Sequence, residues 1–306
     1  MALQTSRQQK KSRLTKARPS LQPAVLALAL LSLAFTIFFL ESYQSLGQSR
    51  ELKVWFFDVG QGDAIFIETP NHQQILIDGG PGSSVLSKLG GVMLPWDKSI
   101  DAIFFTHPDA DHITGLIPVL ERYEVAAIYE TGLDGPTQTM QTLEAAIVAE
   151  GAAHEIIAAP QTFQIDGLTI RVLSPAPGFD GQMIKDTNAA SVVCELIFKD
   201  TSILLAGDAT ADQEPDYGPL AGDVDVLKVG HHGSLTSTGV ALLNAVTPEI
   251  AIISVGVDNR YGHPHPAVLE RLNQRGITVF RTDQDGDILL ISRGGEPEVF
   301  PAPLPF

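Results

Sequence analysis

Six of the eight histidines in this 306-residue chain lie in three short clusters. The first cluster is the segment Thr106-His107-Pro108-Asp109-Ala110-Asp111-His112, which follows the apolar run Ala102-Ile103-Phe104-Phe105. Two imidazoles and two carboxylates packed this closely need a cation to balance them, and neutral imidazole with carboxylate suits Zn, Mn or Fe. The cluster therefore predicts a metal site at a strand-to-helix turn, in preference to a solvated loop in which Asp111 only caps a helix.

Three later segments carry side chains that would complete such a site. The segment Leu204-Leu205-Ala206-Gly207-Asp208 has the pattern of a buried strand that ends in a carboxylate, well placed to bridge two metals. The segment Val226-Leu227-Lys228-Val229-Gly230-His231-His232 leads from a strand to adjacent histidines, so one can bind metal while the other faces substrate. In Tyr261-Gly262-His263-Pro264-His265-Pro266, prolines stiffen the loop and would hold an imidazole in place.

Strand and helix patterns alternate along the chain after residue 50. Apolar runs rich in β-branched residues predict strands near 52–57, 63–68, 74–78, 102–106, 126–130, 168–173, 190–198, 201–206, 225–229, 250–255, 277–281 and 287–292. Helical spacing fits 113–122, 137–150, 236–246 and 266–275. This alternation favours two packed sheets with helices outside. The stretch 174–188, rich in Pro and Gly, is expected to form one long loop.

The first fifty residues differ from the rest in charge and hydropathy. Six Lys and Arg precede residues 24–40, which are apolar except for Ser32 and Thr36 and are near the lower length limit for crossing a bilayer. The positive-inside rule then places residues 1–23 in the cytoplasm. We expect a transmembrane signal anchor at 24–40, a linker at 41–51 and one domain at 52–306 outside the cytoplasm. A cleaved signal peptide stays an alternative, with Ser45-Leu46-Gly47 as a weak cleavage site.

The composition limits the partners of that domain. Hydrophobic residues make up 44% of the chain, which is ample for a buried core. The whole chain has a net charge of −16, but residues 1–50 hold seven basic residues against Glu41, so the remainder carries 13 basic and 35 acidic residues, or −22. Such a surface disfavours tight nonspecific binding of nucleic acid. The single cysteine, Cys194, lies in an apolar run and is expected to be a buried structural thiol.

Six motifs, in this order along the chain, resemble those of the metallo-β-lactamase superfamily, and within it the extracytoplasmic domain of ComEC competence proteins and its stand-alone relatives. They are Phe57-Asp58-Val59-Gly60-Gln61-Gly62-Asp63-Ala64, Ile77-Asp78-Gly79-Gly80, the segment 106–112, Gly207-Asp208, Gly230-His231-His232-Gly233-Ser234 and Tyr261-Gly262-His263-Pro264. The resemblance covers residues 52–292. It implies an αββα sandwich of two mixed β-sheets flanked by helices, with two divalent metal ions at one edge of the sheets.

The resemblance also implies roles for individual residues. His107 and Asp109 would hold one ion, Asp111 and His112 the other, and Asp208 would lie between the two. His232 is favoured as the further ligand and His231 as a group that touches substrate, although the reverse stays open. His263 would stabilise or protonate the leaving group. Asp58 and Asp78 are expected to support the ligands, whereas His72 and His265 have no counterpart and are expected at the surface.

Two departures from the superfamily pattern affect the metal. Its commonest first motif has His at the position of Asp109, and its middle-motif histidine is absent from the matching stretch 186–191. Harder ligands and one fewer imidazole weaken zinc binding, so Zn and Mn both stay open.

The expected chemistry is hydrolysis of a phosphodiester by a water activated between two metals. Asp111 or Asp208 would orient the nucleophile, and Lys228, Arg260 or Ser234 would bind phosphate. The resemblance implies a nuclease acting on single-stranded DNA, while the charge of −22 leaves room for a small phosphoester or a lipid head group. Another class of ester or amide hydrolase, and a non-catalytic metal-binding interaction module tethered to the membrane, stay as alternatives.

Overall fold

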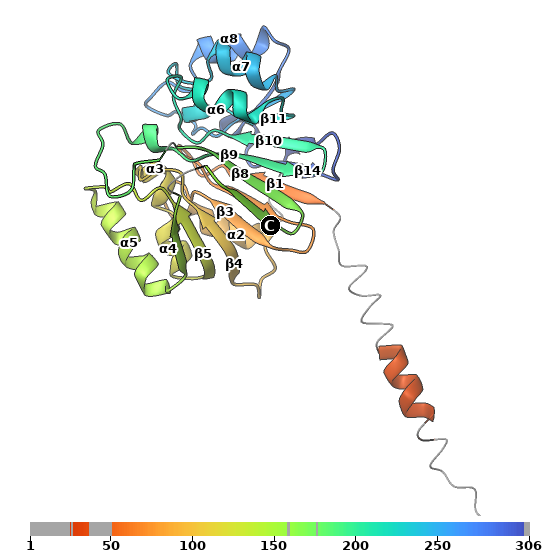
Figure 1. Ribbon diagram of the computed structural model, residues 1–306. Helices are drawn as coiled ribbons and strands as arrows, with labels where there is room; N and C mark the ends of the chain where they lie inside the picture. The colour runs from red at the N-terminus through yellow and green to blue at the C-terminus, as the bar shows by residue number, and fades with distance from the viewer. Residues whose placement is uncertain (1–24, 26, 37–50, 158–159, 176, 303–306) are drawn as a thin grey trace, which may run out of the picture. The chain divides into compact units, whose positions relative to one another are not determined.

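The computed structural model describes residues 25, 27–36, 51–157, 160–175 and 177–302, and within these ranges residues from 51 onward form two β-sheets (Figure 1). The first sheet runs in the order β15 (Glu298–Pro301), β14 (Ile288–Ser292), β1 (Leu52–Phe56), β2 (Ile65–Glu68), β3 (Gln74–Ile77), β4 (Ser99–Phe104), β5 (Glu124–Glu130) and β6 (Ala153–Ile156). Strands β3 to β6 are parallel and the others pair antiparallel, so the sheet is mixed.

The second sheet is mixed in the same way. Its order is β13 (Thr278–Arg281), β12 (Ile250–Ile253), β11 (Val226–Lys228), β10 (Thr201–Leu205), β9 (Val193–Phe198), β8 (Leu168–Ser174) and β7 (Thr162–Ile165). Strands β10 to β13 are parallel, and β7 to β10 are antiparallel. Because parallel strands end at the same edge of a sheet, the loops after β10, β11 and β12 emerge together.

Three apolar layers hold the two sheets and their helices. The inner layer lies between the sheets and takes Leu52, Val54 and Phe56 from β1, whereas Trp55 faces the outer layer of the first sheet. In that outer layer lie α2 (Ser84–Val92), α3 (Ala110–Ile113), α4 (Leu116–Leu120) and α5 (Gln138–Glu150). The third layer packs α6 (Glu214–Ala221), α7 (Val240–Val246) and α8 (Pro266–Asn273) against the second sheet. A strand buried on both faces explains the continuous apolar runs in the sequence.

The expected αββα sandwich of two mixed sheets is confirmed, while several boundaries were wrong. One helix was expected over 113–122, but the structure has two, α3 and α4, with Gly115 between them. The backbone of Gly115 lies against Gly79, so closely that an added Cβ would meet the Gly79 carbonyl oxygen at 1.9 Å. The short strands β6, β7 and β15, the helices α2 and α6 and the single turn α9 (Thr282–Asp285) were not expected from the sequence. The stretch 175 and 177–186 contains no strand or helix, as expected of a loop.

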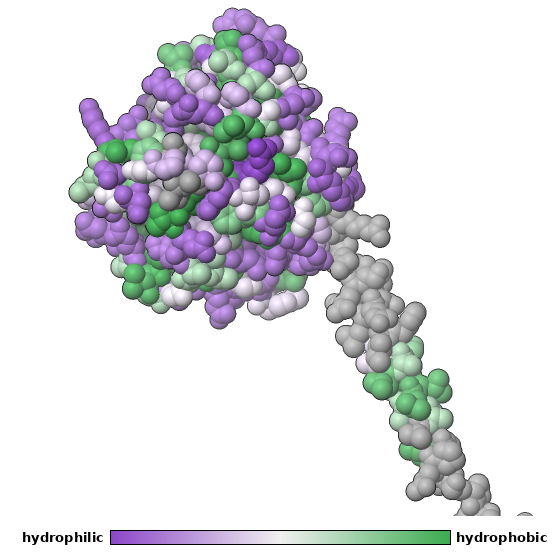
Figure 2. Space-filling model, in the orientation of Figure 1, coloured by the Kyte–Doolittle hydropathy of each residue, from purple (hydrophilic) through white to green (hydrophobic). Residues whose placement is uncertain are grey.

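The described part of the N-terminal region is helical at residue 25 and at residues 27–36, with exposed and mostly hydrophobic side chains (Figure 2). None of the helices among the described residues reaches the length and apolar character needed to cross a membrane. Residues 1–23 and most of the expected linker, as well as the ends of the expected anchor at 24–40, lie outside the described residues. The transmembrane anchor therefore stays a prediction.

Candidate metal centre

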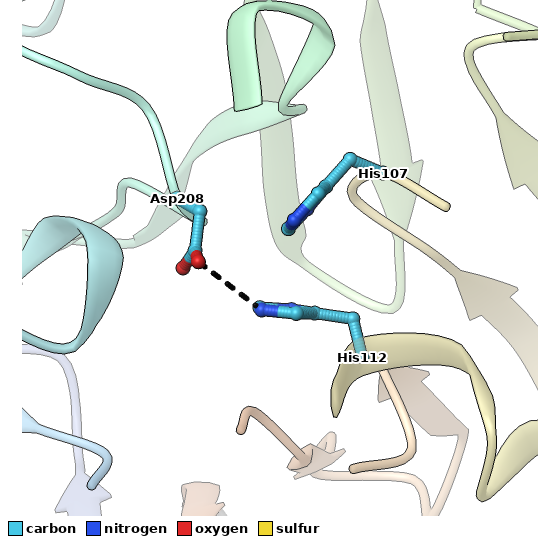
Figure 3. A group of neighbouring side chains, drawn as sticks. All are labelled: His107, His112 and Asp208. Atoms are coloured by element: carbon cyan, nitrogen blue, oxygen red, sulfur yellow. Dashed lines mark ion pairs between the residues drawn. The ribbon is translucent and has the colours of Figure 1, made fainter. Parts of the chain in front are cut away.

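The residues singled out from the sequence meet where strands of both sheets end. His107 lies in the turn after β4, His112 lies in α3, and Asp208 follows β10 in the second sheet (Figure 3). The Nε2 atom of His112 lies 3.4 Å from Oδ2 of Asp208. His232, from the turn η2 (Gly230–Gly233) after β11, places its Nε2 atom 3.3 Å from the same oxygen. Asp111 joins this group through a distance of 3.5 Å between its Oδ2 atom and Nε2 of His232.

Hydrogen bonds on the far side of each ring fix the atoms that face this cluster. The Nδ1 atom of His112 lies 2.7 Å from Oδ2 of Asp78, and that of His232 lies 2.9 Å from the carbonyl oxygen of Ser254. His107 Nδ1 lies 2.9 Å from the hydroxyl of Thr106, which donates to Asp78. In the neutral form of each ring the Nδ1 atom therefore carries the proton, and the Nε2 atom then presents a lone pair to the centre, as in metal-ligating histidines.

The atoms that face the centre are better placed to bind a metal ion than to form hydrogen bonds with one another. The Nε2 atoms of His107, His112 and His232 and the Oδ1 atom of Asp208 are buried without a hydrogen-bond partner. Buried polar atoms without a partner are costly and rare in folded proteins. Groups of ligand atoms within 4.8 Å of one another include His107, His112 and Asp208, and also Asp111, His112 and His232. The donor set therefore suits divalent cations.

The position of Asp109 differs from that of the other residues in the cluster. Its Oδ2 atom is 3.7 Å from Nε2 of His107, but its side chain is 42% exposed. Its Oδ1 atom accepts a hydrogen bond of 2.5 Å from Thr187. Thr187 belongs to the turn η1 (Thr187–Ala190), the stretch where the middle-motif histidine is absent. Carboxylate and hydroxyl groups thus surround His107 on this side.

The adjacent histidines adopt different orientations, as the sequence indicated. Both His231 and His232 have positive φ angles, 47° and 52°, which cost side-chain-bearing residues free energy and often occur at functional sites. The ring of His231 lies at 73° to that of His232, with its Nε2 atom 3.9 Å from Oδ2 of Asp208. Its ring also lies 5.6 Å from that of His263, whose Nδ1 atom is buried without a partner. His231 and His263 thus lie beside the cluster rather than inside it.

Asp63 is a member of the site that the sequence analysis missed. It is 1% exposed, and its Oδ1 atom, also without a hydrogen bond, lies 3.5 Å from Nδ1 of His232. Its other oxygen accepts a hydrogen bond from the fully buried ammonium group of Lys228, which also donates to the carbonyl oxygen of Gly207 at 3.2 Å. The available signal was a lysine inside an otherwise apolar strand, which predicts a buried acidic partner.

The carboxylates dominate the electrostatics of the cluster. Burial is the largest single effect on His112 and His232 and would lower their pKa values, but the surrounding carboxylates, Asp208 first among them, together outweigh it. They raise the pKa of His112 well above its usual range and that of His232 to about 9. Burial opposes ionisation of Asp111, but the contact of its Oδ2 atom with the His232 ring at 3.5 Å and the charges of His112 and His232 lower its pKa to about 2. Burial lowers the pKa values of His107, His231 and His263. The centre therefore attracts positive charge, which a proton or a metal ion can supply.

Several expectations for neighbouring residues need correction. Lys228 was expected as a phosphate-binding group, but its burial and ion pair with Asp63 exclude contact with substrate. Ser234 is 7% exposed, and its hydroxyl bonds that of Thr236 within its own loop. Asp58 accepts from the backbone of Gly60 and so shapes the loop after β1.

Neither of the two histidines without a family counterpart belongs to the groups of candidate ligands, although His265, which was expected at the surface, donates its backbone N–H to Gly233 beside His232. His265 is half-buried, and its ring accepts a hydrogen bond of 3.1 Å from Ala267 at the start of α8. The side chain of His72 is 54% exposed, as expected of a surface residue.

Comparison with protein families agrees with this fold. Residues 57–257 match the family model described as the metallo-beta-lactamase superfamily, so the chain belongs to that superfamily. It is 35% identical over 260 residues to ComE operon protein 3 of Bacillus subtilis (strain 168), covering 78% of this chain and 33% of that protein. It is 30% identical over 250 residues to competence protein ComA of Neisseria gonorrhoeae, covering 80% and 33%. The chain thus spans about a third of the length of these relatives.

Solved structures share the fold at low sequence identity. The metallo-beta-lactamase fold protein YhfI from Bacillus subtilis superposes with a TM-score of 0.57 at 14% identity, covering 79% of this chain and 99% of that one. CmlA, a diiron beta-hydroxylase from Streptomyces venezuelae, gives a TM-score of 0.51 at 15% identity, covering 82% and 54%. Fold, family and donor atoms together define a metal-dependent hydrolase of the metallo-beta-lactamase superfamily.

Proposed function

We propose that the domain is a phosphodiesterase that uses two divalent metal ions, with single-stranded DNA as its substrate class. The observation that carries this proposal is the set of unpartnered Nε2 atoms of His107, His112 and His232 around Asp208. Asp208 lies between two donor groups, as a residue shared by two ions must. Two ions held there would supply an activated water and would neutralise charge on a phosphoryl group.

The chain's own residues would divide between the two ions. His107 and Asp109 would hold the first, and Asp111, His112 and His232 the second, with Asp208 shared. Asp78 orients His112 directly and His107 through Thr106, so one carboxylate aligns ligands of both ions. The carboxylate and hydroxyl groups around His107 are hard ligands, which is why Mn competes with Zn as the occupant.

His231 and His263 would act on the substrate. Both lie beside the cluster with lowered pKa values, caused first by burial, so both rings are neutral near pH 7. A neutral imidazole donates one hydrogen bond, which stabilises charge that develops on the leaving oxygen. The geometry favours His231 for the group nearer the phosphorus, because its Nε2 atom is 3.9 Å from Asp208.

The choice of a phosphodiester rests on the relatives of the chain. One is the competence protein ComA, and another is recombination protein 2 of Haemophilus influenzae, which is 31% identical to this chain. The same likeness supports a membrane-anchored protein whose hydrolase domain faces away from the cytoplasm, with residues 24–40 as the anchor. The net charge of −22 beyond residue 50 favours a second candidate, a small phosphoester substrate.

Metal content and hydrolysis of the full chain in mild detergent test the proposal. About two ions per chain, with chelation abolishing cleavage of bis-p-nitrophenyl phosphate and Zn or Mn restoring it, is the expected result. Asp208→Ala should lose both metal and activity, whereas Glu144→Ala, on the exposed face of α5, should retain both. Metal binding without cleavage of this substrate or single-stranded DNA would instead indicate a binding module, and nitrocefin cleavage a lactam hydrolase.

A further inference from the structure

Two cavities border the metal centre, and they have no lining residue in common. The first, of about 490 Å³, is lined by Gln61, Pro81, Ala110, Asp111, Asp258, Asn259, Arg260 and Tyr261. The second, of about 400 Å³, is lined by Asp186, Asn188, Thr210, Ala211, Asp212, His231 and Thr236. Asp111 and His231 each belong to the cluster or touch its edge, so a substrate bound at the centre extends into one cavity or both.

The two cavities differ in charge. Arg260 is the one Lys or Arg among the described residues that line them, and its side chain is exposed. Each cavity carries two carboxylates, those of Asp111 and Asp258 in the first and those of Asp186 and Asp212 in the second, so the guanidinium group of Arg260 is what distinguishes them. A second phosphate next to the one at the metals would find a guanidinium partner on the Arg260 side, whereas the second cavity offers it carboxylates and no Lys or Arg. The position of Arg260 therefore favours binding of the neighbouring phosphate in the first cavity.

An aromatic row connects Arg260 with the metal centre. The guanidinium carbon of Arg260 lies 5.0 Å from the ring centroid of Tyr261, and Nη2 donates to the Tyr261 hydroxyl at 2.9 Å. The rings of Tyr261 and His263 are nearly parallel, at 21° with centroids 5.7 Å apart. Tyr261 nevertheless stays 54% exposed. An exposed phenol ring beside a guanidinium group offers a ligand a stacking face and a positive charge at one place.

The loop that carries this pair is held in shape by Asn259. Its side-chain amide nitrogen donates to the carbonyl oxygens of Gly256 and His263 at 3.0 and 2.6 Å, and its oxygen accepts from the backbone of Tyr261 and His263 at 3.2 and 3.0 Å. Gly256 packs so closely on Gln61 that an added Cβ would meet the Gln61 nitrogen at 2.6 Å. The platform is thus built before substrate arrives, which lowers the entropy cost of binding.

We propose that Arg260 and Tyr261 form the subsite for the nucleotide next to the scissile bond. The guanidinium group binds the neighbouring phosphate, and the base stacks on the platform made by the guanidinium and the phenol ring. Only an unpaired base can reach such a platform, so the subsite selects single strands. This inference rests on the proposed phosphodiesterase function, since it assigns the flanking group of that same substrate.

Binding without turnover tests the subsite first. The probe is a fluorescein-labelled oligothymidylate of about eight nucleotides, added to the full chain in detergent with excess EDTA and followed by anisotropy. Tyr261→Ala is expected to weaken binding about tenfold with the salt dependence unchanged, and Tyr261→Phe to stay within about twofold. Arg260→Ala should reduce the slope of log affinity against log salt by about 0.7, the value for one phosphate contact on a single strand.

A matched variant separates this contact from general charge. Arg122→Ala removes an equally exposed arginine that precedes β5, at the sheet edge opposite to the metal centre, and should leave affinity and slope as in the wild type. An unchanged slope in Arg260→Ala, or the same decrease in Arg122→Ala, would overturn the subsite. So would a wild-type chain that fails to bind the probe at low salt.

Hydrolysis distinguishes the subsite from the function on which it rests. With metal restored, Arg260→Ala and Tyr261→Ala should lose about tenfold in kcat/KM on the oligonucleotide. The control variants Arg122→Ala and Glu144→Ala should cleave both the oligonucleotide and bis-p-nitrophenyl phosphate like the wild type. Probe binding that both subsite variants weaken, without any hydrolysis by the wild type, would support the subsite and contradict the phosphodiesterase. If the wild type cleaves bis-p-nitrophenyl phosphate and both subsite variants bind the probe like the wild type, the phosphodiesterase is supported and the subsite is contradicted.

Discussion

The buried ion pair between Lys228 and Asp63 offers a sharp test of how the site is supported. Lys228→Met keeps the length of the side chain but removes the ammonium group that pairs with Asp63 and donates to Gly207. The side chains are 0% and 2% exposed, so water cannot replace the lost partner. Asp63 would lose the ammonium partner of its Oδ2 atom and keep the contact of Oδ1 with Nδ1 of His232 at 3.5 Å.

The expected magnitude follows from the burial of both groups. Removing one partner of a fully buried pair costs about 3–5 kcal/mol in the free energy of unfolding, because the other charge stays uncompensated. Adding Asp63→Asn removes that charge as well. The double variant Asp63→Asn/Lys228→Met should therefore recover about 2 kcal/mol relative to Lys228→Met alone, the range expected for coupled neighbours.

Urea unfolding of the chain in excess EDTA measures these values without a contribution from bound metal. Fluorescence of Trp55, which is 8% exposed and packs in the outer layer of the first sheet, reports the loss of the core. The midpoint for Lys228→Met should fall by about 1 M or more. A loss below about 1 kcal/mol, or a double variant less stable than the single one, would contradict the argument from uncompensated charge.

Three further outcomes are expected. Asp78→Asn should weaken metal binding about 10–100-fold, as measured by competition with a chelator, because its carboxylate orients the ligand His112. Metal affinity should rise with pH between about pH 6 and 9, by up to about tenfold per pH unit for each proton displaced. The reason is that His232, with a pKa of about 9, must lose a proton before it can bind the metal. Calorimetry in buffers of different ionisation enthalpy counts the protons released. Gly62→Ala should lower metal content, because the added Cβ would meet the carbonyl oxygen of Asp111 at 2.0 Å. Gly60→Ala is the control, since Gly60 also has a positive φ angle but has nothing within 4 Å of an added Cβ. Equal metal content in the two variants would argue against a steric effect on Asp111.

Much of the site could be predicted from the sequence because its residues follow strong strand patterns. His107, Asp208 and His232 each come after an apolar run, and runs of that kind become strands whose ends converge in a two-sheet fold. The spacing of ligand types within each turn then indicates a metal. No knowledge of pairing between distant segments is needed for this step.

Asp63 could not be predicted in the same way. It follows a glycine in a turn-like segment, and its partner Lys228 lies 165 positions along the chain. The helices α2 and α6 were missed because Gly90, Gly91 and Pro219 have low helix propensity, which packing on the sheets overrides. The edge strands β6 and β15 were missed because a strand with little buried surface shows no apolar alternation.

The metal centre draws its donor atoms from both sheets, since His107 and His112 follow a strand of the first and Asp208 and His232 follow strands of the second. An ion bound there links the two halves of the sandwich and is lost when they separate. At a free metal concentration of 100 times Kd, one such site adds about 2.7 kcal/mol to the free energy of unfolding. The supply of divalent metal would therefore govern how long the folded protein persists, so that scarcity lowers the amount of protein as well as the activity of each molecule.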